Sequence, residues 1–230
     1  MQLFYSDFVS ENLIILKEEE AKHLFVLRKQ VNDTIWITDG KGHLFETEII
    51  EIVKKEISLK IINKSAPERE PKPFVHLYIA PTKQNERIEW MLEKLIEVGL
   101  NEISFIETKN SERCHQKINR LEKIAISAMK QSLQFQLTKI NSIIPYSDAV
   151  LKSKEDINLI GYCGEEDFKT LNEIEFTNEN SIAIFIGPEG DFTKEEIEMA
   201  KNKKFLPIRM GKNRLRTETA GLMAATFFKY

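Results

Sequence analysis

Two short segments near the C-terminus combine glycine with charged residues in a pattern that suits ligand binding. The first is Ile186-Gly187-Pro188-Glu189-Gly190, and the second runs from Met210-Gly211 to Arg216-Thr217-Glu218-Thr219-Ala220. Glycine lets the backbone approach a ligand because no β-carbon is in the way. Backbone N–H groups at the start of a following helix remain free to bind that ligand. We therefore expect both segments to build a single pocket.

Charged residues within the two segments offer acid–base and charge-stabilising chemistry. Arg216 is a permanent cation that can stabilise developing negative charge, while Glu189 and Glu218 can accept a proton. A carboxylate near a helix start is a weak base, however, and Arg216 can equally well form an ion pair with either glutamate. Neither segment has the lysine spacing of a P-loop or the dinucleotide G-x-G-x-x-G pattern, which argues against phosphate cradling.

Both segments need a strand before them and a helix after them to hold their shape. Apolar runs at 182–186 and 205–210 predict buried strands. Thr193 begins a capping box that starts a helix. An apolar helix rich in small residues is predicted over 220–228, with its start near Thr217. Because such a helix is buried, the polar residues at its head must be satisfied by neighbours or by a ligand.

Strands alternate with helices over the whole C-terminal part of the chain. The predicted strands are 75–80, 103–106 and 158–161 together with the two above, and the predicted helices are 88–98, closed by Gly99, and 118–135. This alternation predicts a mostly parallel sheet covered on both faces. Ligands of such sheets bind beyond the carboxyl ends of the strands, where both glycine segments would lie.

The N-terminal part is instead dense in short β-like runs. Strands are predicted at 13–16, 34–38, 45–53 and 57–62, with a helix at 18–27, which indicates a small barrel. Three prolines and four charges within 66–73 then predict a stiff, extended linker. We therefore predict two domains, 1–70 and 71–230.

The composition indicates the expected cellular location of the protein and argues against membrane and metal binding. Of the 230 residues 42% are hydrophobic and 30% charged, yet no apolar stretch reaches the roughly 20 residues that span a bilayer. The N-terminus lacks the pattern of a signal peptide. Cys114 and Cys163 are too few for a disulfide framework or a zinc site, and His23 and His115 lack metal-ligand spacing. We expect a cytoplasmic protein that binds neither a membrane nor a metal.

Lysine and arginine are concentrated in two segments. Residues 109–139 contain seven Lys/Arg against two Asp/Glu and residues 201–230 eight against one, whereas 155–200 contain two against thirteen. Two basic segments on an otherwise acidic chain favour a polyanion-binding face, and solvated helix faces are the plainer alternative. Arg113 and Arg120 are accordingly interpreted as phosphate contacts or as solvated charges, and Gln131 as bonding to backbone or to a base.

Together the two glycine segments resemble the paired signature of the SPOUT methyltransferases, and more narrowly of the RsmE family of ribosomal RNA (uracil-N3) methyltransferases. The similarity extends over the whole chain. His23-Leu24, 26–28 and 39–42 are similar to that family's N-terminal RNA-binding domain, and 93–99, 111–113 and 130–132 also have counterparts.

The resemblance implies an α/β fold in which a PUA-like β-barrel precedes a SPOUT-type, mostly parallel sheet with a C-terminal trefoil knot. It implies a homodimer that binds S-adenosyl-L-methionine and methylates N3 of a uridine in 16S ribosomal RNA, with the assembled 30S subunit as the expected substrate. Arg216, Glu189 and Glu218 are then the expected catalytic residues. The expected cofactor-binding residues are Ile186, Gly187, Gly190, Met210, Gly211, Leu215, Thr219 and Ala220, and the expected RNA-binding residues are Arg28, Arg113, Arg120 and Gln131.

Two positions depart from the family pattern. Gln134 stands where the family usually has an arginine, and Asp191 stands where the glycine-rich turn usually continues with another glycine. Two other classes of function stay open. A non-catalytic RNA-binding assembly factor leaves the glycine segments without a purpose, and a different nucleotide-using α/β enzyme needs phosphate-binding features that the chain lacks.

Overall fold

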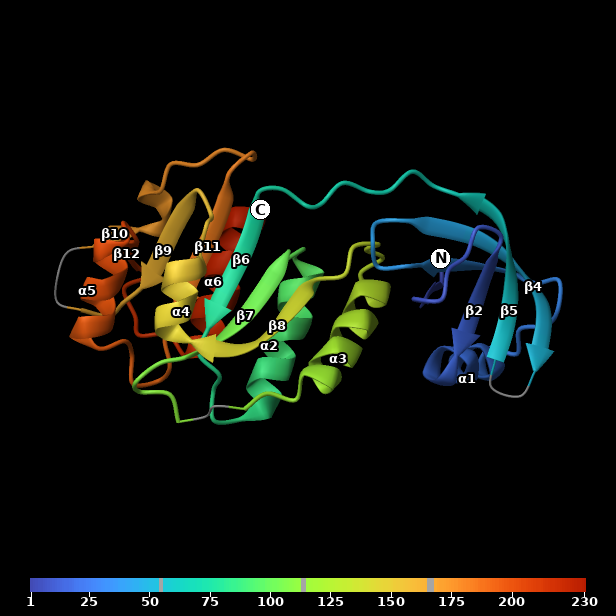
Figure 1. Ribbon diagram of the computed structural model, residues 1–230, viewed down its shortest axis with the longest axis horizontal. Helices are drawn as coiled ribbons and strands as arrows, with labels where there is room; N and C mark the ends of the chain where they lie inside the picture. Colours follow the sequence, from blue (N-terminus) through green and yellow to red (C-terminus); the bar gives the residue numbers. More distant parts are fainter. Residues whose placement is uncertain (54–55, 113–114, 165–167) are drawn as a thin grey trace. The chain divides into compact units, whose positions relative to one another are not determined.

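The chain forms two compact units, shown in Figure 1. The computed structural model describes residues 1–53, 56–112, 115–164 and 168–230. Unit 1 comprises Met1–Glu70 and Ile126–Leu137, and unit 2 comprises Pro71–Ala125 and Thr138–Tyr230. The segment 126–137 belongs to unit 1, which the boundary proposed at residue 70 did not include. It is held there because the Phe135 carbonyl accepts hydrogen bonds from Gly42 N (2.9 Å) and Thr38 Oγ1 (3.1 Å).

Unit 1 is a small β-barrel that also contains helix α1 and, through residues 126–131, the end of helix α3 (Ile118–Gln131). Its sheet has the strand order β1-β3-β4-β5-β2. Residues just after β1 return to β2, because Ile15 N donates to Phe8 O (3.1 Å) and Val9 forms an antiparallel bridge with Ile14, so the two edges of the sheet meet. The predicted barrel is thereby confirmed. The elements are β1 (Leu3–Tyr5), β2 (Leu13–Lys17), α1 (Glu18–Val26), β3 (Thr34–Thr38), β4 (Leu44–Val53) and β5 (Glu56–Lys64).

Unit 2 is built on a seven-stranded sheet with the order β10-β12-β9-β11-β6-β7-β8, in which every neighbouring pair is parallel. The predicted parallel sheet is therefore confirmed. All carboxyl ends consequently lie along one edge. The strands are β6 (Phe74–Ile79), β7 (Glu102–Glu107), β8 (Lys139–Pro145), β9 (Ile157–Gly161), β10 (Lys169–Thr170), β11 (Ser181–Ile186) and β12 (Leu206–Arg209).

Helices cover both faces of this sheet, as Figure 1 shows. On one face α6 packs against α2, β6 and β11, and on the other α5 packs against α4 and β12. Residues 210–216 therefore carry the chain from one face to the other before α6 begins, which is where the knot predicted from the resemblance would form. The helices are α2 (Asn85–Glu97), α3 (Ile118–Gln131), α4 (Tyr146–Lys152), α5 (Lys194–Asn202), α6 (Thr217–Lys229) and the 3-10 turn η1 (Leu171–Glu173).

The helix predicted over 118–135 is shorter than expected. It ends at Gln131, because Leu133 adopts a positive φ of 56° that a continuing helix forbids. Gln134 lies in the turn that follows, where its Nε2 donates to Ser132 Oγ (3.0 Å). Strand β8 and helix α4 had no sequence prediction.

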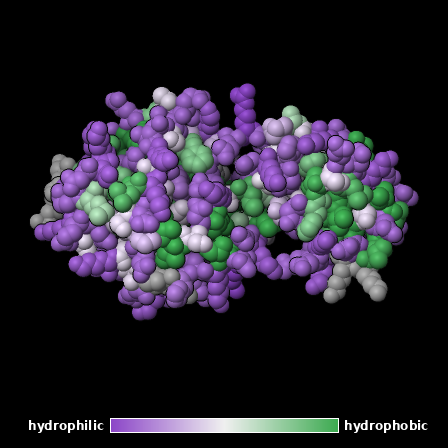
Figure 2. Space-filling view, in the orientation of Figure 1, coloured by the Kyte–Doolittle hydropathy of each residue, from purple (hydrophilic) through white to green (hydrophobic). Residues whose placement is uncertain are grey.

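Hydrophobic side chains are interspersed on a mostly hydrophilic surface, as Figure 2 shows for one face of the molecule. Large exposed apolar residues occur in both units, among them Val26 and Ile62 in unit 1 and Met199 and Met223 in unit 2. Within the described ranges, every helix is too short or too polar to span a membrane.

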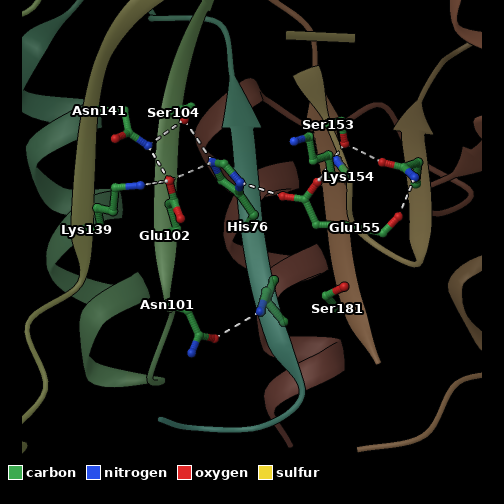
Figure 3. A network of polar contacts seen from close by, with 12 residues as sticks. His76, Asn101, Glu102, Ser104, Lys139, Asn141, Ser153, Lys154, Glu155 and Ser181 are labelled. Atoms are coloured by element: carbon green, nitrogen blue, oxygen red, sulfur yellow. Dashed lines mark hydrogen bonds and ion pairs between the residues drawn. The ribbon is translucent and has the colours of Figure 1, made fainter. Parts of the chain in front are cut away.

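A buried polar network crosses the sheet near the amino end of β6 (Figure 3). His76 Nδ1 lies 2.7 Å from Glu155 Oε1, and His76 Nε2 lies 2.8 Å from Ser104 Oγ, which accepts from Asn141 Nδ2 (2.9 Å). Burial raises the pKa of Glu155, but hydrogen bonds from His76 and Ser153 outweigh it and lower this pKa to about 2. The network lies near the amino ends of β6, β7 and β8, away from the carboxyl edge of the sheet, and satisfies buried polar groups there.

Candidate functional site

The two glycine segments lie side by side at the carboxyl edge of the unit 2 sheet. The first follows β11 and the second follows β12, and β9 lies between these two strands. A β-carbon added at Gly161, the last residue of β9, would lie 3.1 Å from Ile186 Cδ1 and 3.5 Å from Met210 Cγ. Gly161 therefore permits the close approach of both segments.

The first segment forms a tight turn whose shape is fixed by hydrogen bonds. Asp191 N donates to Pro188 O (2.9 Å), and Asp191 itself has a φ of 60°. Asn110 Nδ2, from the segment after β7, donates to the carbonyls of Gly190 (3.1 Å) and Asp191 (3.0 Å). The helix start predicted at Thr193 is confirmed, because its side chain accepts from Glu196 N in a complete capping box.

The second segment is tied to the first by two hydrogen bonds. Arg214 Nη2 donates to Glu189 O (2.9 Å), and the buried Thr217 Oγ1 donates to Gly187 O (3.0 Å). Thr217 is also the first residue of α6, so the head of this helix is anchored on the first turn. By contrast, a β-carbon added at Gly211 would meet no atom of the described residues within 4 Å. The backbone at Gly211 is thus open to a ligand.

The predicted charged residues differ in their surroundings. Glu218 is only 6% exposed, its Oε1 lies 3.7 Å from Arg87 Nε, and its buried Oε2 has no hydrogen-bond partner among the residues that the structure describes. Glu189 and Arg216 are exposed. The ion pair of Arg216 with either glutamate, left open by the sequence, is not formed within the described part of the chain. The guanidinium of Arg216 is therefore available to a ligand.

A cavity of about 630 Å³ opens beside the second segment and α6. Its walls include Met210, Gly211 and Thr219, which the sequence assigned to cofactor binding. Ile186, Gly187, Gly190, Leu215 and Ala220 do not line it. The remaining lining residues, half of them apolar, come from β10, η1, β12 and α6: Thr170, Leu171, Asn172, Arg209, Leu222, Met223, Thr226 and Phe227.

The four expected RNA-binding residues are distributed over both units. Arg28, exposed just after α1, and Gln131, exposed at the end of α3, belong to unit 1. Arg120 belongs to unit 2, where it forms an ion pair with Glu89 through Nη2 and Oε2 (2.7 Å) while its side chain stays 64% exposed. Arg113 lies outside the described residues.

Sequence reasoning missed the contribution of the segment after β9. Cys163 N donates to Asp191 Oδ2 (3.0 Å), and Tyr162 N donates to Ile208 O (3.1 Å). This segment is therefore hydrogen-bonded both to the end of the first glycine turn and to β12. The available signal was a third strand ending in glycine, Gly161, with Gly164 three residues later. Asn110 and Arg87 carried no such signal because their partners are remote in sequence.

Comparisons with known proteins agree with this architecture. A family model described as an RNA methyltransferase domain matches residues 68–229, and one described as an RNA methyltransferase PUA domain matches residues 16–62. Ribosomal RNA small subunit methyltransferase E of Mesomycoplasma hyopneumoniae (strain 232) is 31% identical over 232 residues, covering 98% of each chain.

Solved structures of similar proteins have the same fold. A crystal structure described as a probable rRNA-methyltransferase from Porphyromonas gingivalis has a TM-score of 0.92 and 38% identity, covering 99% of this chain and 96% of that one. The ribosomal RNA small subunit methyltransferase E from Neisseria gonorrhoeae, bound to S-adenosyl methionine, has a TM-score of 0.84 and 27% identity, covering 98% and 95%.

Proposed function

Because this chain belongs to the family of RNA methyltransferases, we propose that it transfers a methyl group from S-adenosyl-L-methionine to N3 of a uridine in 16S ribosomal RNA. The observation that carries the proposal is the junction of the two glycine segments across Gly161, at the edge where parallel sheets bind ligands. Relatives named small subunit methyltransferase E cover nearly the whole chain, which supports the small ribosomal subunit as the substrate.

The residues present fit S-adenosyl-L-methionine. The backbone at Gly211 is open, and the neighbouring cavity is large enough for a small-molecule ligand and mostly apolar, as adenine requires. Backbone groups of both turns supply hydrogen-bond partners, and Thr219 supplies a hydroxyl. In this proposal the donor is held by Ile186, Gly187, Gly190, Met210, Gly211, Leu215, Thr219 and Ala220.

The chemistry asks the protein mainly for positioning and for control of one proton. When bound, the donor supplies an electrophilic methyl on a sulfonium sulfur; the methyl–sulfur bond breaks as the bond to N3 forms, and the sulfur becomes a neutral thioether. Arg216, exposed and without an ion-pair partner in the described segments, stabilises the uridine anion. Glu218, whose buried Oε2 has no hydrogen-bond partner within the described residues, or the exposed Glu189 accepts the N3 proton.

The same proposal assigns RNA contacts and assembly. Arg28, Arg113, Arg120 and Gln131 contact the RNA, with the arginines on phosphates. The protein acts in the cytoplasm as a homodimer whose pocket borders the partner subunit, and the apolar side chains of α6 around the cavity support this arrangement.

Transfer of labelled methyl groups tests the proposal. The protein is incubated with methyl-labelled S-adenosyl-L-methionine and small ribosomal subunits that lack the modification, and the labelled base is mapped. We expect one labelled uridine, methylated at N3, in 16S RNA. Binding of RNA without binding of the donor, measured by calorimetric titration, would instead favour a non-catalytic assembly factor. Competition by ATP for the donor site would favour a nucleotide-using enzyme.

A further inference from the structure

We infer that Asp191 is a positioning residue that fixes the first glycine turn against the segment after β9, at the edge of the sheet where the donor is proposed to bind, an inference that rests on the proposed function. Asp191 is also the position where this chain departs from the glycine usual in the family. Its φ of 60° lies in the left-handed region, which glycine adopts freely and aspartate only with some strain. An aspartate kept in such a conformation points to a role for its side chain.

The carboxylate of Asp191 bridges two segments. Its Oδ1 accepts from Phe192 N (2.8 Å) within the turn, and its Oδ2 accepts from Cys163 N (3.0 Å) after β9. Hydrogen bonds to an ionised carboxylate are stronger than those between neutral groups. Partial desolvation and the nearby Asp191 carboxylate raise the pKa of the Cys163 thiol, so the thiol stays neutral beside this bridge.

The bridged segments are the ones that would face the donor. Cys163 lies two residues after Gly161, whose backbone separates Ile186 from Met210. Asn110 holds the same turn through the carbonyls of Gly190 and Asp191, and Arg214 holds it through Glu189 O. Asp191 completes this set by fixing the turn against the end of β9. A binding site held this firmly loses little conformational entropy when its ligand binds.

Three proteins test the role of the carboxylate. Asp191→Gly keeps the backbone conformation but removes the bridge, whereas Asp191→Asn keeps an oxygen that can accept from Cys163 N. Calorimetric titration with S-adenosyl-L-methionine should show a dissociation constant raised about tenfold in Asp191→Gly and less than threefold in Asp191→Asn. Lys204→Gly is the matched control, since Lys204 also has a positive φ of 65° but has no place at this edge. It should leave the dissociation constant unchanged.

A second readout is independent of the donor. Hydrogen exchange of the Cys163 amide in the free protein should be faster in Asp191→Gly than in the wild-type protein and Asp191→Asn. Wild-type affinity in Asp191→Gly, or unchanged exchange at Cys163, would overturn the inference. If the wild-type protein bound no donor, both the proposed function and the role of Asp191 in donor binding would be wrong. The exchange data would still show whether Asp191 bridges the two segments.

Discussion

Arg216 stands at the head of α6 with its guanidinium exposed and, across the described ranges, without an ion-pair partner. We predict that Arg216→Ala retains donor affinity but lowers the methylation rate about 100-fold, because a group aimed at developing charge acts mainly in the transition state. Single-turnover methylation and calorimetric titration measure the two quantities. Lys212→Ala removes an exposed cation from the same segment and should change neither. Unchanged turnover in Arg216→Ala would eliminate the charge-stabilising role.

Glu155 links the stability of unit 2 to pH. Its pKa is lowered from the usual 4.5 to about 2 in the folded protein, so its stabilising effect is complete above pH 4.5 and disappears as the pH falls through about 2. We predict that Glu155→Gln lowers the free energy of unfolding at pH 7 by at most about 3 kcal/mol. Urea unfolding of both proteins should show this difference narrowing between pH 4.5 and 2. A difference that stays constant over that range would contradict the assignment.

From the residue types, the chemistry of the site could be predicted, but the contacts between its residues could not. The roles proposed for Arg216, Glu189 and Glu218 came from their types near glycine. The Arg87–Glu218 contact and the bridge from Asp191 to Cys163 join residues that are remote in sequence, so no local pattern predicts them. The buried His76 network was missed for the same reason, since Glu155 reaches β6 from 79 residues away.

At the level of elements, the helices and strands with a strong periodic pattern could be predicted from the sequence. The capping box at Thr193 and the positive-φ Gly99 after α2 are confirmed, as are the strands that precede both turns. β8 was missed because it is an edge strand with polar Asn141 and Ser142 within it, and β10 because it has only two residues. Such elements depend on their neighbours rather than on their own residues.

Two glycines of unit 2 differ in how tightly they are packed, so the same substitution to alanine should affect them differently. A β-carbon at Gly221, within α6, would lie 2.9 Å from Ile79 Cδ1 and 3.3 Å from Leu77 Cδ2, both fully buried. One at Gly211 would meet no atom within 4 Å in the described part of the chain. We predict that Gly221→Ala lowers the free energy of unfolding by about 1 kcal/mol, because overpacking outweighs the better helix propensity of alanine.

Gly211→Ala is the matched variant. It should leave the free energy of unfolding unchanged but weaken donor binding about tenfold, since the added methyl group occupies the open side of the turn. Denaturant unfolding and calorimetric titration measure both variants. Equal donor affinity in Gly211→Ala and the wild-type protein would show that the donor does not approach this backbone.

At the scale of the whole molecule, the proline-rich segment 66–73 predicted a boundary between two domains, but two long-range features were beyond sequence patterns. Residues 126–137 join unit 1 through bonds to residues about a hundred positions earlier, such as Thr38 to Phe135. Lys229, near the end of α6, donates to Pro73 O (2.6 Å) at the start of unit 2. Both features consist of contacts between residues far apart in the sequence, which local composition does not determine.

The proposed homodimer places α6 at the subunit interface. We predict that the wild-type protein sediments at about twice the chain mass of 26.8 kDa. Met223→Glu should yield single chains with less than about a tenth of the wild-type methylation rate, because the substitution puts a charge on the apolar wall of the cavity beside α6. Met199→Glu is the control: Met199 is 40% exposed and Met223 42%, but Met199 lies on α5, on the opposite face of the sheet. A wild-type protein that sediments as a fully active single chain would contradict the dimer.

A crystal structure of the protein soaked with S-adenosylhomocysteine, the demethylated donor, would show directly whether the two glycine segments bind the donor. We predict that the product contacts the 186–190 and 210–216 turns and occupies the cavity beside α6, with its sulfur directed toward Arg216. Turns that stay closed upon each other and free of ligand, with the product bound elsewhere or not at all, would contradict it.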